Sequence, residues 1–201
     1  VLIAIGGTGN YEGLFDDKLG LEVDRGHIKV NKETYQTNLP GVYAVGDVIG
    51  PPWLAHVASE EAIVCVEKIA GHKADAIDYA AIPGCTYCHP QVASIGLTER
   101  ACKEQGLEYT VGKFPFLASG KARAVGSTEG FVKIIADKKY GQILGAHMIG
   151  ENVTELIAEV GLAMRLEATA DELIATMHAH PTISESVHEA ALGTDGRMIH
   201  Y

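Results

Sequence analysis

The sequence has no excess of basic residues and no long apolar run, and each shortage excludes a class of protein. Its 16 lysines and arginines stand against 26 aspartates and glutamates, which gives a formal net charge of −10. An acidic chain without a basic run is a poor partner for phosphate backbones or anionic membrane surfaces, so we expect neither nucleic acid nor membrane as a partner. No apolar stretch approaches the roughly 18–20 residues of a membrane span.

Cysteine is scarce as well, and its spacing does not support a disulfide framework. Four cysteines are present, of which Cys65 and Cys102 stand alone in the sequence. This usage fits reduced thiols, so we expect a cytoplasmic protein, or one of the mitochondrial matrix if the source is eukaryotic. Residues 85–89 spell Cys-Thr-Tyr-Cys-His, the pattern of covalent haem attachment. Short motifs of this kind often arise by chance, and we favour coincidence over a haem protein.

Two motifs of nucleotide and redox chemistry are also missing. No G-x-G-x-x-G occurs in the 201 residues, so the chain carries no dinucleotide-phosphate loop of this kind. No two cysteines are separated by four residues. The chain opens at Val1 inside an apolar run, residues 1–5, that predicts a buried strand. We therefore expect this chain to be part of a longer protein.

Glycine and proline mark a division of the chain near residues 71–84. Before this division, the apolar runs at residues 28–30 and 42–45 predict further short strands. Residues 54–70 have helical apolar spacing, and Gly71 is placed to end that helix. The first part of the chain therefore reads as an α/β segment.

Beyond the division, the sequence predicts antiparallel strands mixed with helices. Residues 131–135 and 143–149 are apolar runs on either side of a turn, which is typical of a hairpin. Further helices are predicted by apolar spacing and by capping signals, namely residues 98–106, residues 153–166, and two that begin at the capping boxes Thr169–Glu172 and Thr182–Glu185. The second part therefore reads as an α+β domain.

One stretch of the second part carries residue types suited to proton transfer. A helix that starts near Pro181 puts Glu185 on its first turn, from which the carboxylate can turn back toward His180. An imidazole oriented by a carboxylate is the recurring design of a general base. The alternative is that Glu185 only caps the helix with Thr182. The tight spacing of His178 and His180 disfavours a metal site, and we expect none.

Asp47 follows the run at residues 42–45 and is the second candidate. A carboxylate beyond the carboxyl end of a strand can accept hydrogen bonds from ligand hydroxyls. The alternative, which local evidence favours, is a turn aspartate that holds its own loop. Surface or packing roles are expected for the histidines that show no partner pattern, namely His27, His72, His147, His188 and His200.

Six stretches occur in an order that resembles the C-terminal part of the dihydrolipoamide dehydrogenases, a branch of the FAD- and NAD-dependent disulfide reductases. They span nearly the whole chain: residues 1–6, 37–47, 54–56, 113–116, 143–147 and 178–185. The resemblance implies an α/β remnant of the FAD and NAD domains at residues 1–78. An α+β dimerisation domain, an antiparallel sheet with helices, is expected at residues 79–201.

The resemblance also implies roles for single residues. Asp47 corresponds to a carboxylate that holds the ribityl chain of the flavin, and Gly6 corresponds to a glycine beside the nicotinamide nucleotide. The segment that runs under the flavin ring corresponds to Trp53, Leu54, Ala55 and His56. His180 corresponds to the catalytic base, and Glu185 corresponds to the acid that orients it. FAD and NAD are thus the cofactors expected of the full-length protein, and none is expected to stay with this chain alone. We also expect a cis peptide bond between His180 and Pro181.

The function implied is oxidation of dihydrolipoyl groups through a disulfide and FAD to NAD+. This chain would supply the dimer interface and the His180–Glu185 pair, and would be inactive alone. The implied partners are a second copy of the protein and the lipoyl domain of a 2-oxo acid dehydrogenase complex. Two alternatives stay open: another flavin disulfide reductase, of the glutathione or mercuric type, and a stand-alone dimerisation module without catalysis.

Overall fold

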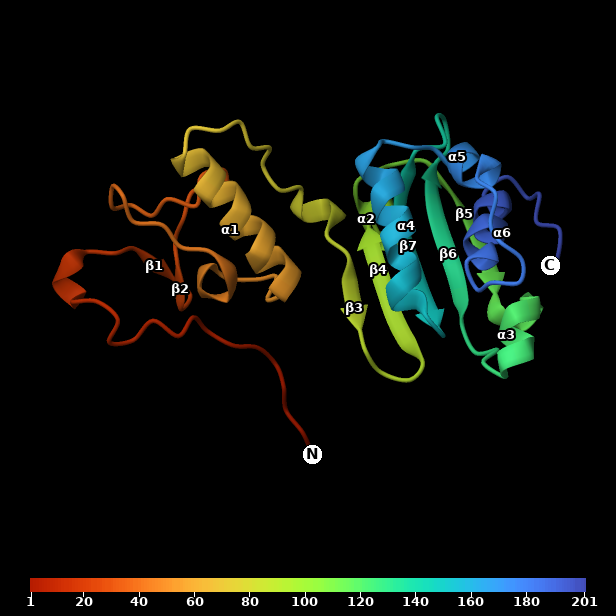
Figure 1. Cartoon of the computed structure of the whole chain (residues 1–201), viewed down its shortest axis with the longest axis horizontal. Coiled ribbons are helices and arrows are strands. Elements are labelled where there is room, and N and C mark those ends of the chain that lie inside the picture. The colour runs from red at the N-terminus through yellow and green to blue at the C-terminus, as the bar shows by residue number, and fades with distance from the viewer. The chain divides into compact units, whose positions relative to one another are not determined.

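The structure is a computed structural model that describes residues 1–201 except the side chain of residue 17. It divides into two units, Val1–Asp78 and Tyr79–Tyr201, here called unit 1 and unit 2 (Figure 1). The elements of unit 1 are η1 (Asp17–Leu19), β1 (Val23–Asp24), β2 (His27–Ile28), η2 (Gly46–Ile49) and α1 (Ala55–Ile69). Strands β1 and β2 pair with each other in an antiparallel ladder.

Helix α1 organises unit 1 and confirms the helix predicted from apolar spacing. Its buried face packs with η2 and with the loop residue Tyr35, which is fully buried. The helix stops as expected, because Gly71 adopts a φ of +77°, a left-handed conformation that glycine takes without a steric penalty. The opposite face of α1 leaves Ile63, Val66 and Ile69 half exposed or more.

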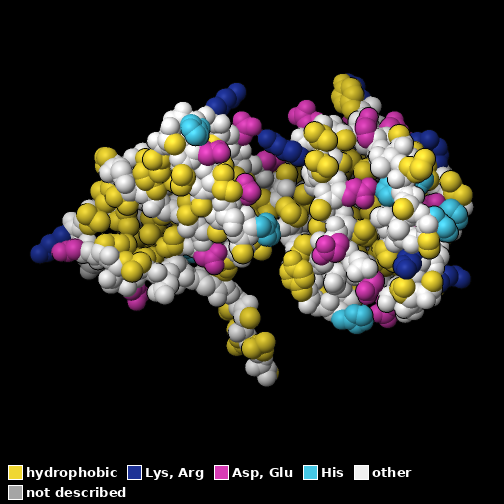
Figure 2. Space-filling model, in the orientation of Figure 1, with side chains coloured by type: hydrophobic (Ala, Val, Ile, Leu, Met, Phe, Trp, Pro, Cys, Tyr) yellow, Lys and Arg dark blue, Asp and Glu magenta, His cyan; other side chains and the backbone are white. Residues whose placement is uncertain are grey.

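The buried strands predicted for residues 1–5 and 42–45 are wrong. Residues 1–5 are exposed and belong to no strand, and residues 42–45 contribute only an isolated bridge between Tyr43 and Gln36. The strand predicted at residues 28–30 is reduced to the two residues of β2. A strand is stabilised by hydrogen bonds and packing with neighbouring strands. In the described part of unit 1, the sheet consists of the short β1–β2 ladder, so an apolar run has no larger sheet to join. Figure 2 shows apolar side chains gathered on the visible face of unit 1.

Unit 2 is built on a five-stranded antiparallel sheet with the order β3-β4-β7-β6-β5. The strands are β3 (Gly84–Thr86), β4 (Gln91–Gly96), β5 (Tyr109–Pro115), β6 (Phe131–Asp137) and β7 (Ile143–Gly150). The β6–β7 pair confirms the predicted hairpin, with Val132 opposite Met148 and Ile134 opposite Ala146. All four of these side chains belong to the core of the unit.

The helices of unit 2 are η3 (Tyr79–Ala81), α2 (Glu99–Glu104), η4 (Phe116–Ala118), α3 (Gly120–Val125), α4 (Val153–Arg165), α5 (Ala170–Ala175) and α6 (Glu185–Gly193). Helix α4 packs on β4 and β7, and α6 packs on β5 and β6 (Figure 1). The predicted helix at residues 98–106 is α2, where Thr98 caps the first turn, and that at residues 153–166 is α4. The predicted α+β fold of this part is confirmed. Among the described helices, none combines the length and the apolar character that crossing a bilayer requires.

Candidate active site

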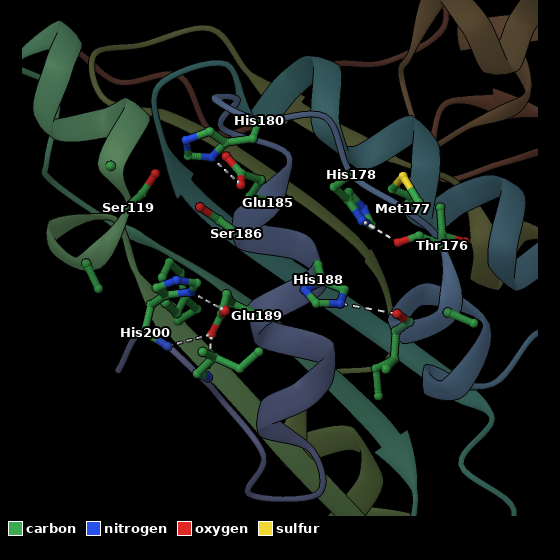
Figure 3. A pocket seen from close by; sticks show the side chains of 16 residues that line it. Ser119, Thr176, Met177, His178, His180, Glu185, Ser186, His188, Glu189 and His200 are labelled. Atoms are coloured by element: carbon green, nitrogen blue, oxygen red, sulfur yellow. Dashed lines mark hydrogen bonds and ion pairs between the residues drawn. The ribbon is translucent and has the colours of Figure 1, made fainter.

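A pocket of about 600 Å³ lies where the segment between α5 and α6 meets the start of α6. Its walls come from β5, α3, α5, α6 and the C-terminal residues, which the fold of unit 2 brings together (Figure 3). Histidine is unusually frequent among the lining residues, which include His178, His180, His188 and His200. Figure 2 shows histidine side chains near one another over the part of unit 2 that carries α6. The pocket therefore concentrates imidazole side chains, which are common donors and acceptors of protons in enzymes.

His180 and Glu185 face each other at this pocket (Figure 3). The Nδ1 atom of His180 lies 2.9 Å from Oε1 of Glu185, while Oε2 of Glu185 accepts a hydrogen bond of 2.9 Å from the backbone N–H of Thr182. The two carboxylate oxygens of Glu185 thus contact different groups, the imidazole of His180 and the backbone of Thr182. The expected cis peptide bond between His180 and Pro181 is confirmed.

The capping boxes predicted at Thr169 and Thr182 have different outcomes. The box at Thr169 and Glu172 is complete and begins α5 as predicted. A full box at Thr182 is wrong, because α6 begins at Glu185 with Ser184 as its N-cap. The Thr182 hydroxyl instead donates to the carbonyl of Ala179, 2.7 Å away, and so ties the segment that carries His180.

The electrostatics of the pair leave one imidazole nitrogen available. Partial burial raises the pKa of Glu185, but the N–H of Thr182 and the imidazole of His180 outweigh burial and lower this pKa below its ordinary value. Glu185 is therefore a carboxylate near neutral pH and can only accept a hydrogen bond. The proton of neutral His180 then resides on Nδ1, and the lone pair is on Nε2. Because the side chain of His180 is 79% exposed, Nε2 is accessible from solvent.

A second histidine–carboxylate pair, absent from the sequence-based prediction, lies beside the first. Nε2 of His178 is 2.7 Å from Oε1 of Glu159 on α4, and its Nδ1 is 2.9 Å from the carbonyl oxygen of Thr176. The side chain of His178 is only 6% exposed. Glu159 raises the pKa of His178 through this hydrogen bond. Nineteen residues separate the partners, a spacing that no local pattern reveals.

Two further histidines of the pocket have hydrogen-bond partners that no local sequence pattern indicates. His200 Nδ1 lies 2.7 Å from Oε1 of the buried Glu189, and His188 Nε2 lies 3.2 Å from the carbonyl oxygen of Ile174 (Figure 3). The backbone N–H of Ile199 also donates to Glu189. These contacts hold the C-terminal residues and α5 against α6, and so fix the walls of the pocket.

Asp47 lies in unit 1, in the turn η2, with its carboxylate exposed. The turn is held from behind by Glu61 of α1, which is 2% exposed and whose Oε2 accepts the N–H of Gly46 at 2.6 Å. Gly46 has a φ of +76°, and a Cβ there would lie 3.1 Å from Cβ of Ala58. Because η2 approaches α1 so closely, the orientation of Asp47 relative to the start of α1 is fixed.

The segment expected under the flavin ring leads into α1. Leu54 is the N-cap of the helix, followed by Ala55 and His56, and no side chain caps it. Trp53 is 40% exposed, and its ring stacks on His27 with centroids 5.9 Å apart. Gly6 adjoins this ring, since a Cβ at Gly6 would lie 3.6 Å from Trp53. The structure thus brings Gly6 and Trp53 together in unit 1, whereas His180 and Glu185 belong to unit 2.

The cysteine motif at residues 85–89 does not form a reactive centre among the described residues. Cys85 is half buried in β3 and Cys88 is exposed in the following turn, and both are free thiols. Burial raises the pKa of Cys85, and likewise that of Cys65 and Cys102, which disfavours their nucleophilic thiolate forms. In the part of the chain that the structure describes, no three side chains of His, Cys, Asp or Glu are placed to hold a metal ion.

Comparison with known proteins assigns this fold to a family of redox enzymes. Residues 82–191 match the dimerisation domain of the pyridine nucleotide-disulphide oxidoreductases, and residues 1–62 match a second domain of these proteins. The chain therefore belongs to the pyridine nucleotide-disulphide oxidoreductase family.

Within that family, the relatives it matches include dihydrolipoyl dehydrogenases. The chain is 51% identical over 200 residues to the enzyme of Rhizobium etli and 48% identical over 201 residues to the mitochondrial enzyme of Pisum sativum. These matches cover 99% and 100% of this chain but only 41% and 40% of the relatives. The chain thus spans about two fifths of the length of the curated relatives it matches.

Solved structures agree with this assignment. The chain superposes on LpdA from Mycobacterium tuberculosis with a TM-score of 0.88 and 26% identity, covering 94% of this chain and 41% of that one. A HOCl-induced flavoprotein disulfide reductase, RclA from Escherichia coli, gives a TM-score of 0.80 at 25% identity, covering 86% of this chain and 40% of that one.

Proposed function

We propose that the gene product containing this chain oxidises dihydrolipoyl groups and passes their electrons through a disulfide and FAD to NAD+. Residues 1–78 would belong to its nucleotide-binding part, and residues 79–201 would form its dimerisation domain. The observation that carries the proposal is the His180–Glu185 pair, which presents an accessible Nε2 lone pair at a pocket. The dihydrolipoyl dehydrogenases among the relatives point to the substrate.

The chemistry assigned to this chain is a proton transfer. Nε2 of His180 accepts the proton of a dihydrolipoyl thiol, and the resulting thiolate attacks a disulfide supplied from outside this sequence. This attack forms a mixed disulfide and releases one thiolate, which takes the proton of the second dihydrolipoyl thiol. The second substrate sulfur then attacks the mixed disulfide, which closes the substrate disulfide and releases the other thiolate. Glu185 stabilises the imidazolium that forms, because its carboxylate lies 2.9 Å from Nδ1. The imidazolium then releases its proton to solvent.

The residues of unit 1 fit the flavin that the family implies. Asp47 offers an exposed carboxylate for ribityl hydroxyls, and the start of α1 is uncapped by any side chain, which leaves a positive dipole end for an electron-rich ring edge. Trp53, Leu54, Ala55 and His56 would run beneath the ring, and Gly6 would lie beside NAD. A flavin held by these residues would supply two-electron transfer between the dithiol and NAD+.

A substrate comparison tests this function. The gene product, purified with its flavin, is expected to reduce NAD+ rapidly with dihydrolipoamide and to show no NADH-linked reduction of oxidised glutathione. The measurement is NADH absorbance with each substrate at equal enzyme concentration. A rapid glutathione reaction with no dihydrolipoamide reaction would instead establish a glutathione-reductase type of enzyme. A flavin-free product without either activity would favour the non-catalytic dimerisation module.

We place the contact with a second copy of the protein on α4 and the segment after α5. Leu162 and Leu166, four residues apart on one face, are 63% and 71% exposed, and Met177 is 95% exposed. Exposed apolar patches of this kind mark protein interfaces. The patch adjoins the segment that carries His180, because Thr176 lines both the pocket at His180 and the neighbouring one at Leu162. Contact there would bring the second copy beside His180.

Leu162→Asp is therefore expected to weaken dimerisation about 100-fold or more, because a carboxylate would be buried without a partner. Light scattering across a dilution series measures the dissociation constant. Leu107→Asp is the control, since Leu107 is partly exposed but lies outside α4, and this variant should remain dimeric. A dimeric Leu162→Asp protein would place the interface elsewhere.

The lipoyl domain of a 2-oxo acid dehydrogenase complex is the proposed macromolecular substrate, since it carries the dihydrolipoyl group. The proposed location is the cytoplasm, or the mitochondrial matrix in a eukaryotic source. The free cysteines support this location, as do the mitochondrial enzymes among the plant relatives.

A further inference from the structure

The segment between α5 and α6 carries His180 with little support from its own backbone. In the described chain, residues 175–181 are exposed with the single exception of His178. The main-chain groups of residues 176–181 make three described hydrogen bonds: the N–H of Thr176 donates to the carbonyl of Glu172 in α5, the carbonyl of Thr176 faces Nδ1 of His178, and the carbonyl of Ala179 accepts the Thr182 hydroxyl. The side chain of His178 is therefore the principal anchor of this segment on the body of unit 2.

The anchor is complete only when the imidazole carries two protons. Its two nitrogens face the carboxylate of Glu159 at 2.7 Å and the carbonyl of Thr176 at 2.9 Å, and both partners can only accept a hydrogen bond. A neutral imidazole has one N–H, so one of these two contacts would lose its donor. With the side chain only 6% exposed, water would not readily replace that donor.

The groups around His178 favour the charged form. Glu159 on α4 is the direct partner, and the charge of Glu185 on α6 acts in the same direction, while burial opposes both. The ring of His188 on α6 lies 5.5 Å from that of His178, and His188 directs Nε2 to the carbonyl of Ile174 in α5. The charged His178 thus joins α4 to the segment, and the ring contact joins it to α6.

We propose that His178, held by Glu159, is a positioning residue for His180. The inference rests on the proposed function, since it assigns His178 a role in orienting the base of that reaction. His180 is 79% exposed, and among the described residues Glu185 is the side-chain partner of its ring, so the direction of the ring depends on the backbone of residues 178–181. When His178 is protonated, this backbone is fixed to α4 and Nδ1 of His180 is held against Glu185. When His178 is neutral, the anchor loosens and the pair is held less often.

The anchor at His178 is expected to weaken as the pH rises. The pKa of His178 is higher in the folded chain than in the unfolded chain. Protonated His178 therefore stabilises the segment fully at pH values below the unfolded-state pKa, and this stabilisation is lost as the pH rises through the folded-state pKa. Loss of the proton from His178 therefore weakens proton acceptance by His180 at alkaline pH.

The test uses the full chain and imidazole NMR, which needs no activity. In the wild-type chain, the His180 Cε1–Hε1 signal is expected to show an inflection that coincides with the titration of His178. Glu159→Gln should move this inflection to lower pH, and His178→Gln should abolish it. Glu155→Gln, which changes an exposed carboxylate on the same helix, is the matched control and should leave the inflection in place. A His180 signal that ignores the titration of His178 in a folded wild-type chain would overturn the proposal.

A kinetic readout separates this proposal from the proposed function. In the gene product with its flavin, Glu159→Gln is expected to lower kcat for dihydrolipoamide about 3–10-fold at alkaline pH, the worth of one hydrogen bond, and to leave KM unchanged. The alkaline limb of the kcat profile should move toward lower pH. An unchanged profile with active wild-type enzyme would overturn the positioning role alone. A wild-type enzyme inactive with dihydrolipoamide would overturn the proposed function, whatever the NMR result.

Discussion

Replacing His180 with alanine in the gene product is expected to lower dihydrolipoamide turnover about 10²–10⁴-fold, the usual worth of a general base. The reason is the geometry of the pair: the Nε2 lone pair is the accessible proton acceptor at the pocket, and alanine has no group to replace it. The flavin should remain bound, because Asp47 and the start of α1 lie in unit 1 and His180 lies in unit 2.

Stopped-flow absorbance distinguishes this loss from a loss of cofactor. It follows enzyme reduction by dihydrolipoamide, and the flavin spectrum before mixing reports occupancy. The loss should appear in this reductive step, while reaction with NADH should change little, since that direction begins with a hydride rather than a thiol. His72→Ala is the control, because His72 is exposed after α1 and has no role in the proposal. Near-normal turnover by the His180→Ala enzyme would remove His180 from the mechanism.

The companion variant Glu185→Gln should cost less than His180→Ala. Glutamine keeps an oxygen that can accept the Nδ1 proton and an amide that fills the same space, but it does not stabilise the imidazolium by charge. The residual rate of Glu185→Gln should therefore lie between those of the wild-type and His180→Ala enzymes. A loss equal to that of His180→Ala would mean that the carboxylate, and not only its position, is essential.

Local signals explain how much of this fold the sequence could predict. Helix α1 and the β6–β7 hairpin follow from patterns within a few residues, namely apolar spacing, a terminating glycine and a turn between two apolar runs. Residues 1–5 and 42–45 have equally apolar sequences, but a strand depends on neighbours that lie elsewhere in a fold. Among the described residues, the run at 1–5 meets no neighbouring strand and the run at 42–45 forms only the bridge from Tyr43 to Gln36, so neither predicted strand forms.

The same distinction separates the two histidine pairs. His180 and Glu185 are five residues apart, so a turn that begins a helix was enough to predict their meeting. His178 and Glu159 meet because α4 and the segment after α5 pack side by side, which depends on the sheet beneath them. A histidine–carboxylate contact within one turn can be predicted from the sequence, whereas a contact that depends on tertiary packing cannot.

Packing of α6 on the sheet also depends on one residue remote from the pocket, Gly112 in β5. A Cβ built on Gly112 would collide with the carbonyl oxygen of Ala190 and would lie 2.6 Å from the backbone nitrogen of Thr194. Both neighbours are backbone atoms of the last turn of α6 and its C-cap, so no side chain can move aside. Any side chain at position 112 must push the helix away from the strand.

Gly112→Ala is therefore expected to lower the free energy of unfolding by about 3 kcal/mol or more, at the upper end for an overpacked core. Urea unfolding followed by circular dichroism measures the change. Gly120→Ala is the matched control, since Gly120 begins α3 and a Cβ there would meet no heavy atom within 4 Å. This control should unfold at the wild-type midpoint or slightly above it, because alanine favours the helix.

The consequence of Gly112→Ala should reach the pocket, because α6 carries Glu185 at its first residue and Glu189 one turn later. A folded Gly112→Ala chain, at low temperature without urea, is expected to show altered imidazole signals for His180 and His200, the partners of these carboxylates. An unfolding midpoint equal to that of Gly120→Ala, with both signals unchanged, would mean that α6 does not rest on Gly112. The position of the orienting carboxylate would then depend on contacts at the pocket alone.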